Sequence, residues 1–254
     1  MKLKTVKLDN TDKILVYNIG DVHYGNENCD REAFKKVVDE IENNPNAYWL
    51  STGDLLEVSL KDSLGDVYKS LSLNEELNEI LEILRPIKHK CFGIVGSNHH
   101  YRVEKRIGLN FDALLCKLLE VDYLGLTGYL RIIVGNVGYY LALHHGIGYG
   151  KSKGIKANNL VYFGNVAKGF DIYMIGHLHS FMYFVENDLV LDKKHNKVSN
   201  IYSHYVITGH FLKYRSSYAE RKLLKPTPIG CAVLELKGGQ SVAQKNIDVF
   251  FKTC

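Results

Sequence analysis

The sequence predicts an α/β fold in a single domain that spans residues 1–254. Short apolar runs typical of buried strands alternate with segments whose apolar residues recur at helical spacing. Several of these runs end in glycine followed by Asp, Asn or His, and open α/β sheets place their sites at the carboxyl ends of strands. In residues 181–254, apolar and polar residues instead alternate, as is typical of antiparallel strands. We therefore expect this part of the chain mainly to complete a second sheet.

The first β-α step covers the region from residue 14 to Pro45. A strand over residues 14–19 leads into Asp21, and an extended backbone from Asp21 to His23 would place both side chains on one side of the chain. A helix follows, with Asp30 as its cap and Pro45 beyond its end.

The second step repeats this pattern. A strand over residues 48–52 is followed by Gly53 and Asp54, and an amphipathic helix over residues 74–85 is capped by Asn74. The leucine stripe of this helix predicts a core-facing side, not a functional one.

The rest of the chain adds six elements to the α/β part and then four strands. The former are a strand at 91–95, a helix at 111–119, a hairpin of 129–134 with 137–143 and, after a loop rich in Gly and Lys, a helix at 159–168 with a strand at 172–175. The final strands are expected at 181–185, 202–207, 231–236 and 242–249. We expect His89, His195 and His204 to be structural or solvated.

Composition narrows the class of protein. The chain is 46% hydrophobic and 24% charged, with a formal net charge of +4 that is spread along its length. These values fit a globular protein and do not by themselves indicate a nucleic-acid or membrane partner. Five cysteines without a CxxC pair fit a reducing compartment, and the longest apolar stretch is broken by Arg131 and Asn136. We expect a cytoplasmic protein that does not bind membranes.

Five strand ends carry clusters of potential metal ligands. Seven of the eleven histidines lie in these clusters, which occupy residues 20–25, 53–57, 96–100, 144–146 and 176–179. Five unrelated turns would be the simpler explanation, but one shared site accounts for all of them. Two metals suit these residue types better than one: Asp21, His23 and His179 for the first, Asn98, His145 and His177 for the second, and Asp54 as a bridge. Nitrogen and oxygen donors favour Mn, Fe, Zn or Ni, of which we favour Mn.

Taken in order, the five motifs resemble those of the calcineurin-like metallophosphoesterase family. They read GDVHYG, GDLLE, SNHHYR, HHG and GHLH, and the match spans roughly residues 14–180. The resemblance implies a four-layer α/β/β/α sandwich of two mixed sheets, with a dinuclear metal centre and a bridging hydroxide at the strand ends. The family's ligands fall on Asp21, His23, Asp54, Asn98, His145, His177 and His179, and its catalytic histidine falls on His99.

Two residues depart from the family pattern, and one ligand is ambiguous. Ser97 replaces the usual glycine, and His100 replaces the acid that orients the catalytic histidine. Either another acid such as Glu104 substitutes, or His99 is a weaker proton donor. The HHG motif allows His144 or His145 as the ligand, and we choose His145 because it directly precedes the glycine.

The resemblance implies a metal-dependent phosphoester hydrolase, and we expect a phosphodiesterase or nuclease. A protein or small-metabolite phosphomonoesterase is the alternative, and a catalytically weak metal-bound scaffold is a third hypothesis. The substrate would be a phosphate ester, with His99 bonding the phosphate or protonating the leaving group. Arg102 would clamp a second oxygen, unless it forms a surface ion pair with Glu104 or Asp112.

Two basic segments raise nucleic acid as a partner. Residues 151–156 carry three lysines directly after the HHG motif, and residues 210–225 interleave cations with aromatics. The cations of residues 210–225 are Lys213, Arg215, Arg221, Lys222 and Lys225. The aromatic residues of the same segment are Phe211, Tyr214 and Tyr218. Such a mixture suits single-stranded phosphate backbones with stacking bases, whereas a solvated charged face with core aromatics is the simpler alternative.

Overall fold

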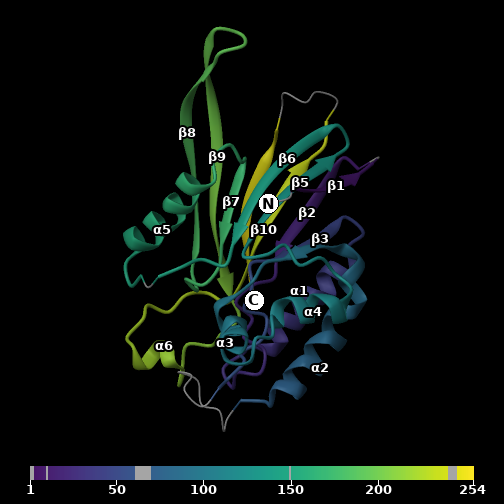
Figure 1. Cartoon of the computed structure of the whole chain (residues 1–254), viewed down its shortest axis with the longest axis vertical. Coiled ribbons are helices and arrows are strands. Elements are labelled where there is room, and N and C mark those ends of the chain that lie inside the picture. The colour runs from purple at the N-terminus through teal and green to yellow at the C-terminus, as the bar shows by residue number, and fades with distance from the viewer. Residues whose placement is uncertain (1–2, 10, 61–69, 149, 240–244) are drawn as a thin grey trace.

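A single mixed β-sheet organises the α/β fold of the chain. The computed structural model describes residues 3–9, 11–60, 70–148, 150–239 and 245–254 (Figure 1). The strands are β1 (Lys4–Leu8), β2 (Lys13–Asn18), β3 (Ala47–Ser51), β4 (Cys91–Ile94), β5 (Thr127–Val134), β6 (Val137–His144), β7 (Ile172–Ile175), β8 (Phe181–Asp192), β9 (Lys197–His210), β10 (Gly230–Lys237) and β11 (Ile247–Thr253). Their order is β1-β5-β6-β7-β9-β10-β2-β3-β4, with β8 paired to β9 and β11 to β10.

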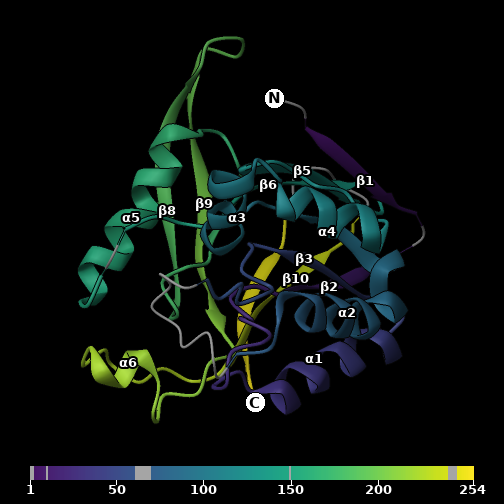
Figure 2. The same ribbon diagram turned by 60° about the horizontal axis from the view of Figure 1, so that its bottom comes forward.

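The helices pack on the outside of the sheet. They are α1 (Arg31–Asn43), α2 (Leu73–Leu84), the 3₁₀ helix η1 (Arg85–Lys90), α3 (Asn98–Ile107), α4 (Phe111–Leu119), α5 (Lys153–Val166) and α6 (Tyr218–Arg221). Helices α1, α2 and α4 lie on the side of β2, β3 and β4, whereas α5 lies near β8 and β9 (Figure 2). Within the described ranges, no helix is both long and apolar enough to cross a membrane.

Strand direction brings the predicted motifs to one edge of the sheet. β2, β3 and β4 are mutually parallel, and so are β6, β7 and β9. β10 is antiparallel to both β2 and β9, so all six strands run in the same direction. The carboxyl ends of β2, β3, β4, β6 and β7 therefore share an edge, and each leads into one of the five motifs.

The two halves of the sheet are joined at a short contact between β9 and β10. Only Gly230 with His210 and Cys231 with Gly209 are in register there. Gly230 has a φ of 142°, and a Cβ atom at this position would lie 1.8 Å from the carbonyl oxygen of Lys252. Glycine is required because β9 and β11 both approach its backbone. The prediction of two separate sheets is not confirmed, since hydrogen bonds connect the described strands into one.

Three clusters of buried apolar side chains hold the layers together. One lies between α1, α2 and α4 and the β2–β4 half and includes Phe34 and Trp49. A second combines side chains of both halves, such as Val16 of β2 and Leu141 of β6. A third includes Leu160 of α5 and packs against β7 and β9. Both faces of these strands are covered, and their sequences are therefore almost continuously apolar.

Several predicted elements needed correction at their ends. α2 begins after Ser72, which forms a capping box with Glu75, and not at a cap from Asn74. α5 begins at Lys153, so two of the three lysines expected on a loop belong to this helix. β11 begins at Ile247, and residues 242–244 of the predicted strand lie outside the described residues.

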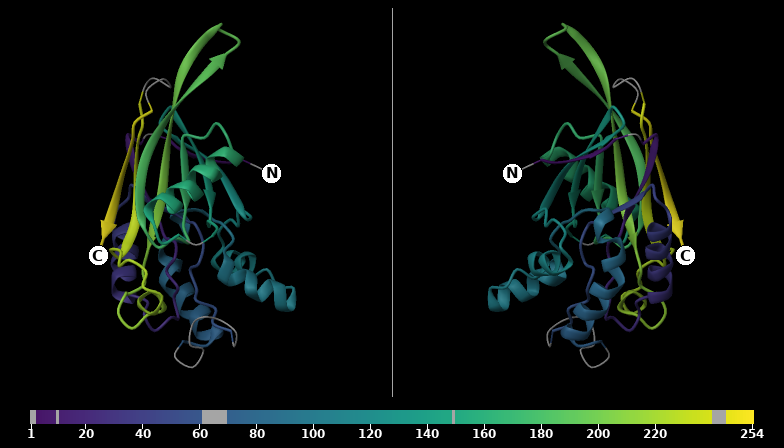
Figure 3. Two further views of the ribbon diagram at one scale, coloured as in Figure 1. Left: turned by 90° about the vertical axis from the view of Figure 1, so that its left-hand side faces the viewer. Right: turned by 90° about the vertical axis from the view of Figure 1, so that its right-hand side faces the viewer.

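Other elements were missed or predicted too short. β1 and α3 were not predicted from the sequence, and both are rich in charged residues. β8 and β9 continue well past the predicted strands as a hairpin that extends beyond the body of the molecule (Figure 3). His195 is exposed in the turn of this hairpin, as expected.

Candidate metal centre

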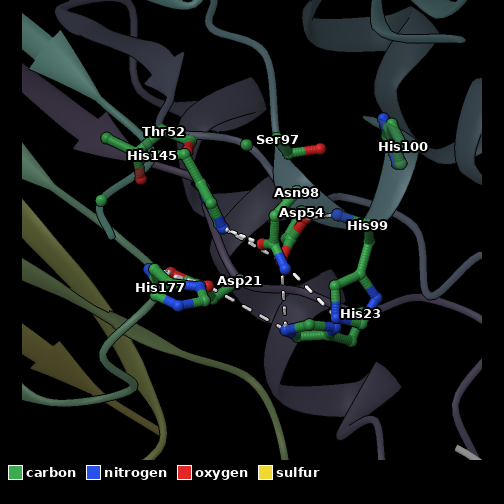
Figure 4. Close-up of polar contacts among 12 residues, drawn as sticks. Asp21, His23, Thr52, Asp54, Ser97, Asn98, His99, His100, His145 and His177 are labelled. Carbon is green, nitrogen blue, oxygen red and sulfur yellow. Dashed lines mark hydrogen bonds and ion pairs between the residues drawn. The ribbon is translucent and has the colours of Figure 1, made fainter. Parts of the chain in front are cut away.

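The five motifs converge at the shared edge of the sheet. Figure 4 shows Asp21, Asp54, Asn98, His145 and His177 facing one another although they follow five different strands. Asp21, His23, Asp54 and His145 are almost completely buried, whereas His99 and His179 are partly accessible. The site is therefore a buried cluster with one open side.

The backbone around the ligand candidates has an uncommon conformation. Asp21, His23, Asp54, His177 and His179 all have positive φ angles, between 42° and 65°. Side chains other than glycine rarely adopt this region, and such residues gather at functional sites. The predicted extended backbone from Asp21 to His23 is thus wrong, and left-handed turns bring the two side chains together.

Asp21, His23 and His179 form a first group. Nε2 of His179 lies 3.3 Å from Oδ1 of Asp21 and 3.1 Å from Nε2 of His23. Nε2 of His23 lies 4.0 Å from the same Asp21 oxygen. One ligand atom from each residue lies within 4.8 Å of the other two, an arrangement that could hold one metal ion.

Asp54, His145 and His177 form a second group of the same kind. Nε2 of His145 lies 3.1 Å from Oδ2 of Asp54 and 2.5 Å from Oδ1 of Asn98. The side chain of Asn98 thus joins this group through its oxygen (Figure 4). The geometry brings together the residues that the sequence assigned to the second metal.

Asp54 lies between the two groups. Its Oδ2 atom is 3.1 Å from Nε2 of His145 and 3.9 Å from Nε2 of His23. A third set of ligand atoms within 4.8 Å consists of His23, Asp54 and His99. Asp54 is therefore placed as a ligand shared by two ions would be.

Three of the ligand histidines have one ring nitrogen held by a hydrogen-bond acceptor. Nδ1 of His145 lies 2.8 Å from the carbonyl oxygen of Thr52, and Nε2 of His177 lies 3.1 Å from that of Gly148. A carbonyl oxygen can only accept, so these nitrogens carry the protons. Nδ1 of His23 donates to Oε2 of Glu57 over 2.9 Å. Such partners fix the tautomer and raise the basicity of metal-binding imidazoles.

The glycine of the GHLH motif is required by close packing. A Cβ atom on Gly176 would lie 2.5 Å from Oδ2 of Asp21 and 2.9 Å from Oγ1 of Thr52. The backbone amide of the next residue, His177, donates to both carboxylate oxygens of Asp21, at 3.0 and 2.8 Å. Gly176 therefore lets β7 end directly against the Asp21 carboxylate.

Electrostatics keeps the two aspartates ionised. Burial opposes ionisation of Asp21 and Asp54, but neighbouring histidines outweigh it and lower both pKa values, that of Asp54 strongly. Burial also opposes the charged form of His145, yet the Asp54 carboxylate raises its pKa to about 9. The Asp54 carboxylate that favours a positive charge on His145 would also attract a bound cation.

His99 is oriented by main chain and not by a following acid. Its Nδ1 atom lies 2.6 Å from the carbonyl oxygen of Glu57, and its Nε2 atom lies 3.9 Å from Oδ2 of Asp54. Burial lowers the pKa of His99 to about 4, although Asp54 acts in the opposite direction. The Glu57 carbonyl takes the orienting role that the sequence analysis considered for Glu104.

His100, which departs from the family pattern, points away from the site (Figure 4). Its Nδ1 atom lies 2.6 Å from Oδ1 of the buried Asp112 on α4. Asp112 also accepts hydrogen bonds from the backbone amide and the hydroxyl of Ser97, at 3.0 and 3.2 Å. The two unusual residues, Ser97 and His100, therefore share one partner that connects the start of α3 to α4.

The structure brings only one of the two histidines of the HHG motif to the ligand groups. His145 belongs to the second ligand group, whereas His144 accepts a hydrogen bond from the amide of Gly146 and packs against Phe163.

Arg102 lies one turn beyond Asn98 in α3 and lines the same cavity as His99. Asp112, one of the ion-pair partners considered for Arg102, is engaged with Ser97 and His100.

Sequence reasoning missed two residues that support the ligands. Glu57 ends the GDLLE motif and contacts both His23 and His99, but its position gave no signal beyond the motif itself. His210 stacks on His179 with ring centroids 5.1 Å apart and bonds Thr227, which donates to the carbonyl oxygen of His179. It follows no motif and is far from His179 in sequence.

The side chains fit a pair of divalent cations. Each group offers imidazole nitrogens and a carboxylate oxygen that lie within 4.8 Å of one another. This mixture suits Mn, Fe, Zn or Ni and contains no thiolate, so it does not distinguish among these ions.

Comparison with known proteins adds structural neighbours. No family model matches the chain, and no curated protein matches it in sequence. Solved structures with a related shape include a predicted phosphoesterase of Streptococcus pneumoniae, with 14% identity over 94% of this chain and 90% of that chain and a TM-score of 0.40. Others are a metallophosphoesterase of Sphaerobacter thermophilus (14% identity, 94% and 88% covered, TM-score 0.40) and Vps29 of Chaetomium thermophilum (12% identity, 94% and 97% covered, TM-score 0.42).

The chain resembles metallophosphoesterases in structure. This metallophosphoesterase likeness extends over nearly the whole length of each pair, but its identities and TM-scores are too low to support an argument about activity. The activity of the chain is therefore inferred from the side-chain geometry of the candidate metal centre.

Proposed function

We propose that this chain is a metal-dependent phosphoester hydrolase with a dinuclear centre, and that it acts on phosphodiesters. The observation that supports this most directly is the position of Asp54 between two groups of ligand atoms, each with one further carboxylate or amide oxygen and two imidazoles. The site residues proposed are Asp21, His23, Asp54, Asn98, His145, His177 and His179 as ligands, with His99 and Arg102 facing the substrate.

Two bound cations would polarise the phosphate and lower the pKa of a water molecule, which supplies the nucleophile at neutral pH. The residues of the chain perform the remaining tasks. Asp21 and Asp54 hold negative charge in a buried site, and Glu57 keeps His23 in the tautomer that presents Nε2. Nδ1 of His99 donates to the carbonyl oxygen of Glu57, so Nε2, 3.9 Å from Oδ2 of Asp54, would bond a phosphate oxygen or pass a proton to the leaving oxygen only after it has taken up a second proton. The fork of Arg102 would bind a second phosphate oxygen.

The experiment compares two small esters. Bis(p-nitrophenyl) phosphate and p-nitrophenyl phosphate are offered to chain that has been stripped of metal and reloaded with Mn, Fe, Zn or Ni. A diesterase hydrolyses the first faster with at least one of these metals and neither ester after chelation. Faster hydrolysis of the monoester would make the chain a phosphomonoesterase, and stable binding of two metals without hydrolysis of either ester would favour the scaffold hypothesis. Nuclease activity is tested with a single-stranded oligonucleotide under the same conditions.

A further inference from the structure

We propose that the site binds a second phosphate group of its substrate, on a cationic wall beside the metal ligands. This inference rests on the proposed phosphoester hydrolysis and adds the chemical class of the substrate: a phosphodiester that carries another phosphate.

The wall belongs to a cavity that opens from the candidate metal centre. It has a volume of about 400 Å³, within the range of small-ligand sites, and is lined by His23, Asp54, His99, His177 and His179. Beyond Arg102, the described lining residues include six cations: Lys151, Lys156, Lys213, Arg221, Lys222 and Lys225. The acids among them are Asp54 and Glu57 of the candidate centre and Glu27. Cations therefore dominate the cavity outside the ligand groups.

Lys156 connects this wall to the ligands. Its ammonium group donates to the carbonyl oxygen of Leu178 over 2.8 Å, between His177 and His179. A side chain held in this way presents its positive charge directly beside both ligand groups. Lys151 also lines the cavity, from the segment just before α5.

The other four cations lie on a segment whose two ends are bonded to ligand residues. At one end, the amide of Phe211 donates to the carbonyl oxygen of Asp21 over 3.0 Å. At the other end, the hydroxyl of Thr227 donates to the carbonyl oxygen of His179 over 2.9 Å. The segment 211–227 therefore starts and finishes at the candidate centre and carries its cations along the cavity. It includes α6, which lies on the same side of the molecule as α5 (Figures 1 and 2).

The cations of this wall have few acidic partners among the described residues. Of the six, only Lys213 has an acidic partner among the described ion pairs, Asp30 at 3.5 Å, and that pair is partly exposed. Charges within about 10 Å of one another are incompletely screened at ordinary salt, so an anion between them gains interaction with several cations at once. A phosphate held by the metal ligands and Arg102 leaves the charges of Lys222 and Lys225 for another group.

The aromatic residues do not support recognition by several stacked bases. Phe211 is fully buried and packs against Phe34, with ring centroids 5.6 Å apart, so it is a core residue. The side chain of Tyr218 lies outside the described residues, and Tyr214 lines the cavity, whereas Arg215 does not. The wall is therefore suited to bind a ligand through its positive charge, and a second phosphate group is such a ligand. That phosphate could come from a nucleic-acid strand or from a small phosphorylated diester.

The test measures affinity as well as turnover. Thymidine dinucleotides with a 5′-phosphate, with a 3′-phosphate or with neither are titrated into the metal-loaded chain by calorimetry, and their hydrolysis is followed separately. We expect one phosphorylated form to bind about ten-fold more tightly than the unphosphorylated one, since a charge-assisted contact is of this size. Equal affinity for all three dinucleotides would overturn the inference.

Variants assign the preference to the wall. In Lys222→Ala/Lys225→Ala, the affinity ratio of phosphorylated to unphosphorylated dinucleotide should fall about ten-fold. The matched control is Lys193→Ala/Lys194→Ala, which removes two exposed lysines from the turn of the β8–β9 hairpin and should leave the ratio unchanged. An unchanged ratio in the first variant, or an equal fall in both, would rule out the wall as the phosphate subsite.

Failure of this inference and failure of the proposed function give different results. Preferential binding that Lys222→Ala/Lys225→Ala abolishes, without hydrolysis of any ester, supports the subsite and contradicts the hydrolase. Hydrolysis without preferential binding of a phosphorylated dinucleotide supports the hydrolase and contradicts the subsite. A ten-residue oligonucleotide with the same terminal phosphate separates the two sources: tighter binding with a steeper salt dependence identifies a strand, and affinity equal to that of the dinucleotide identifies a small ester.

Discussion

The carbonyl oxygen of Glu57 accepts a hydrogen bond from Nδ1 of His99 over 2.6 Å. This bond leaves Nε2 of His99 as the nitrogen near Asp54, 3.9 Å from its Oδ2 atom. The carboxylate of the same Glu57 bonds Nδ1 of His23. One residue thus orients both a proposed metal ligand and the proposed catalytic histidine, the ligand through its side chain and the catalytic histidine through its main chain.

Replacing the shared carboxylate should remove both metals. In Asp54→Asn we expect loss of activity and of most bound metal, because an amide cannot supply the charge that two cations share. Elemental analysis of the purified variant measures this directly. Two metals per chain with turnover close to wild type would exclude Asp54 as the bridge.

Turnover of esters with poor and with good leaving groups distinguishes the two possible roles of His99, proton donor and phosphate binder. His99→Ala should lower turnover of esters with poor leaving groups by roughly two to four powers of ten, the usual scale of general acid catalysis, without changing metal content. The loss should be smaller for nitrophenyl esters, whose leaving groups need no proton. Similar losses on both kinds of ester would instead assign His99 to phosphate binding.

Glu57→Gln tests the side-chain role of Glu57 without removing its carbonyl group. Loss of the carboxylate beside His23 should weaken metal affinity about 10- to 100-fold, the usual effect of losing such a partner. Competition with a chelator of known affinity gives the value. Glu32→Gln, an exposed acid in the first turn of α1, is the matched control and should keep wild-type affinity.

The contact of His100 with Asp112 should stabilise the fold. Asp112→Ala removes the partner of buried His100 and of two groups of Ser97, so we expect a loss of about 3 to 5 kcal/mol in the free energy of unfolding. Urea denaturation measures this loss. Asp122→Ala breaks a partly exposed pair with Lys4 and should cost at most about 1 kcal/mol. Equal effects of the two variants would show that the buried contact is not important for stability.

The α/β class, most strands and helices of residues 14–175, and the set of residues that meets at the strand ends could all be predicted from the sequence. This was possible because buried parallel strands are short apolar runs, and because parallel strands bring their carboxyl ends to one edge. Phe111–Leu119 and Ile172–Ile175 were predicted with their observed bounds. β1, α3 and the outer part of the β8–β9 hairpin lack such patterns because they are charged or exposed.

The connection between the two halves of the sheet and the groups that support each ligand could not be predicted from local sequence. The β9–β10 contact depends on two residue pairs far apart in sequence, and no local pattern specifies it. The partner of His99 is a backbone carbonyl, which every residue possesses, so side-chain identity could not reveal it. The partner of His100 is an aspartate on another helix. Local sequence determines which groups are present, whereas the folded backbone determines which of them come within hydrogen-bonding distance.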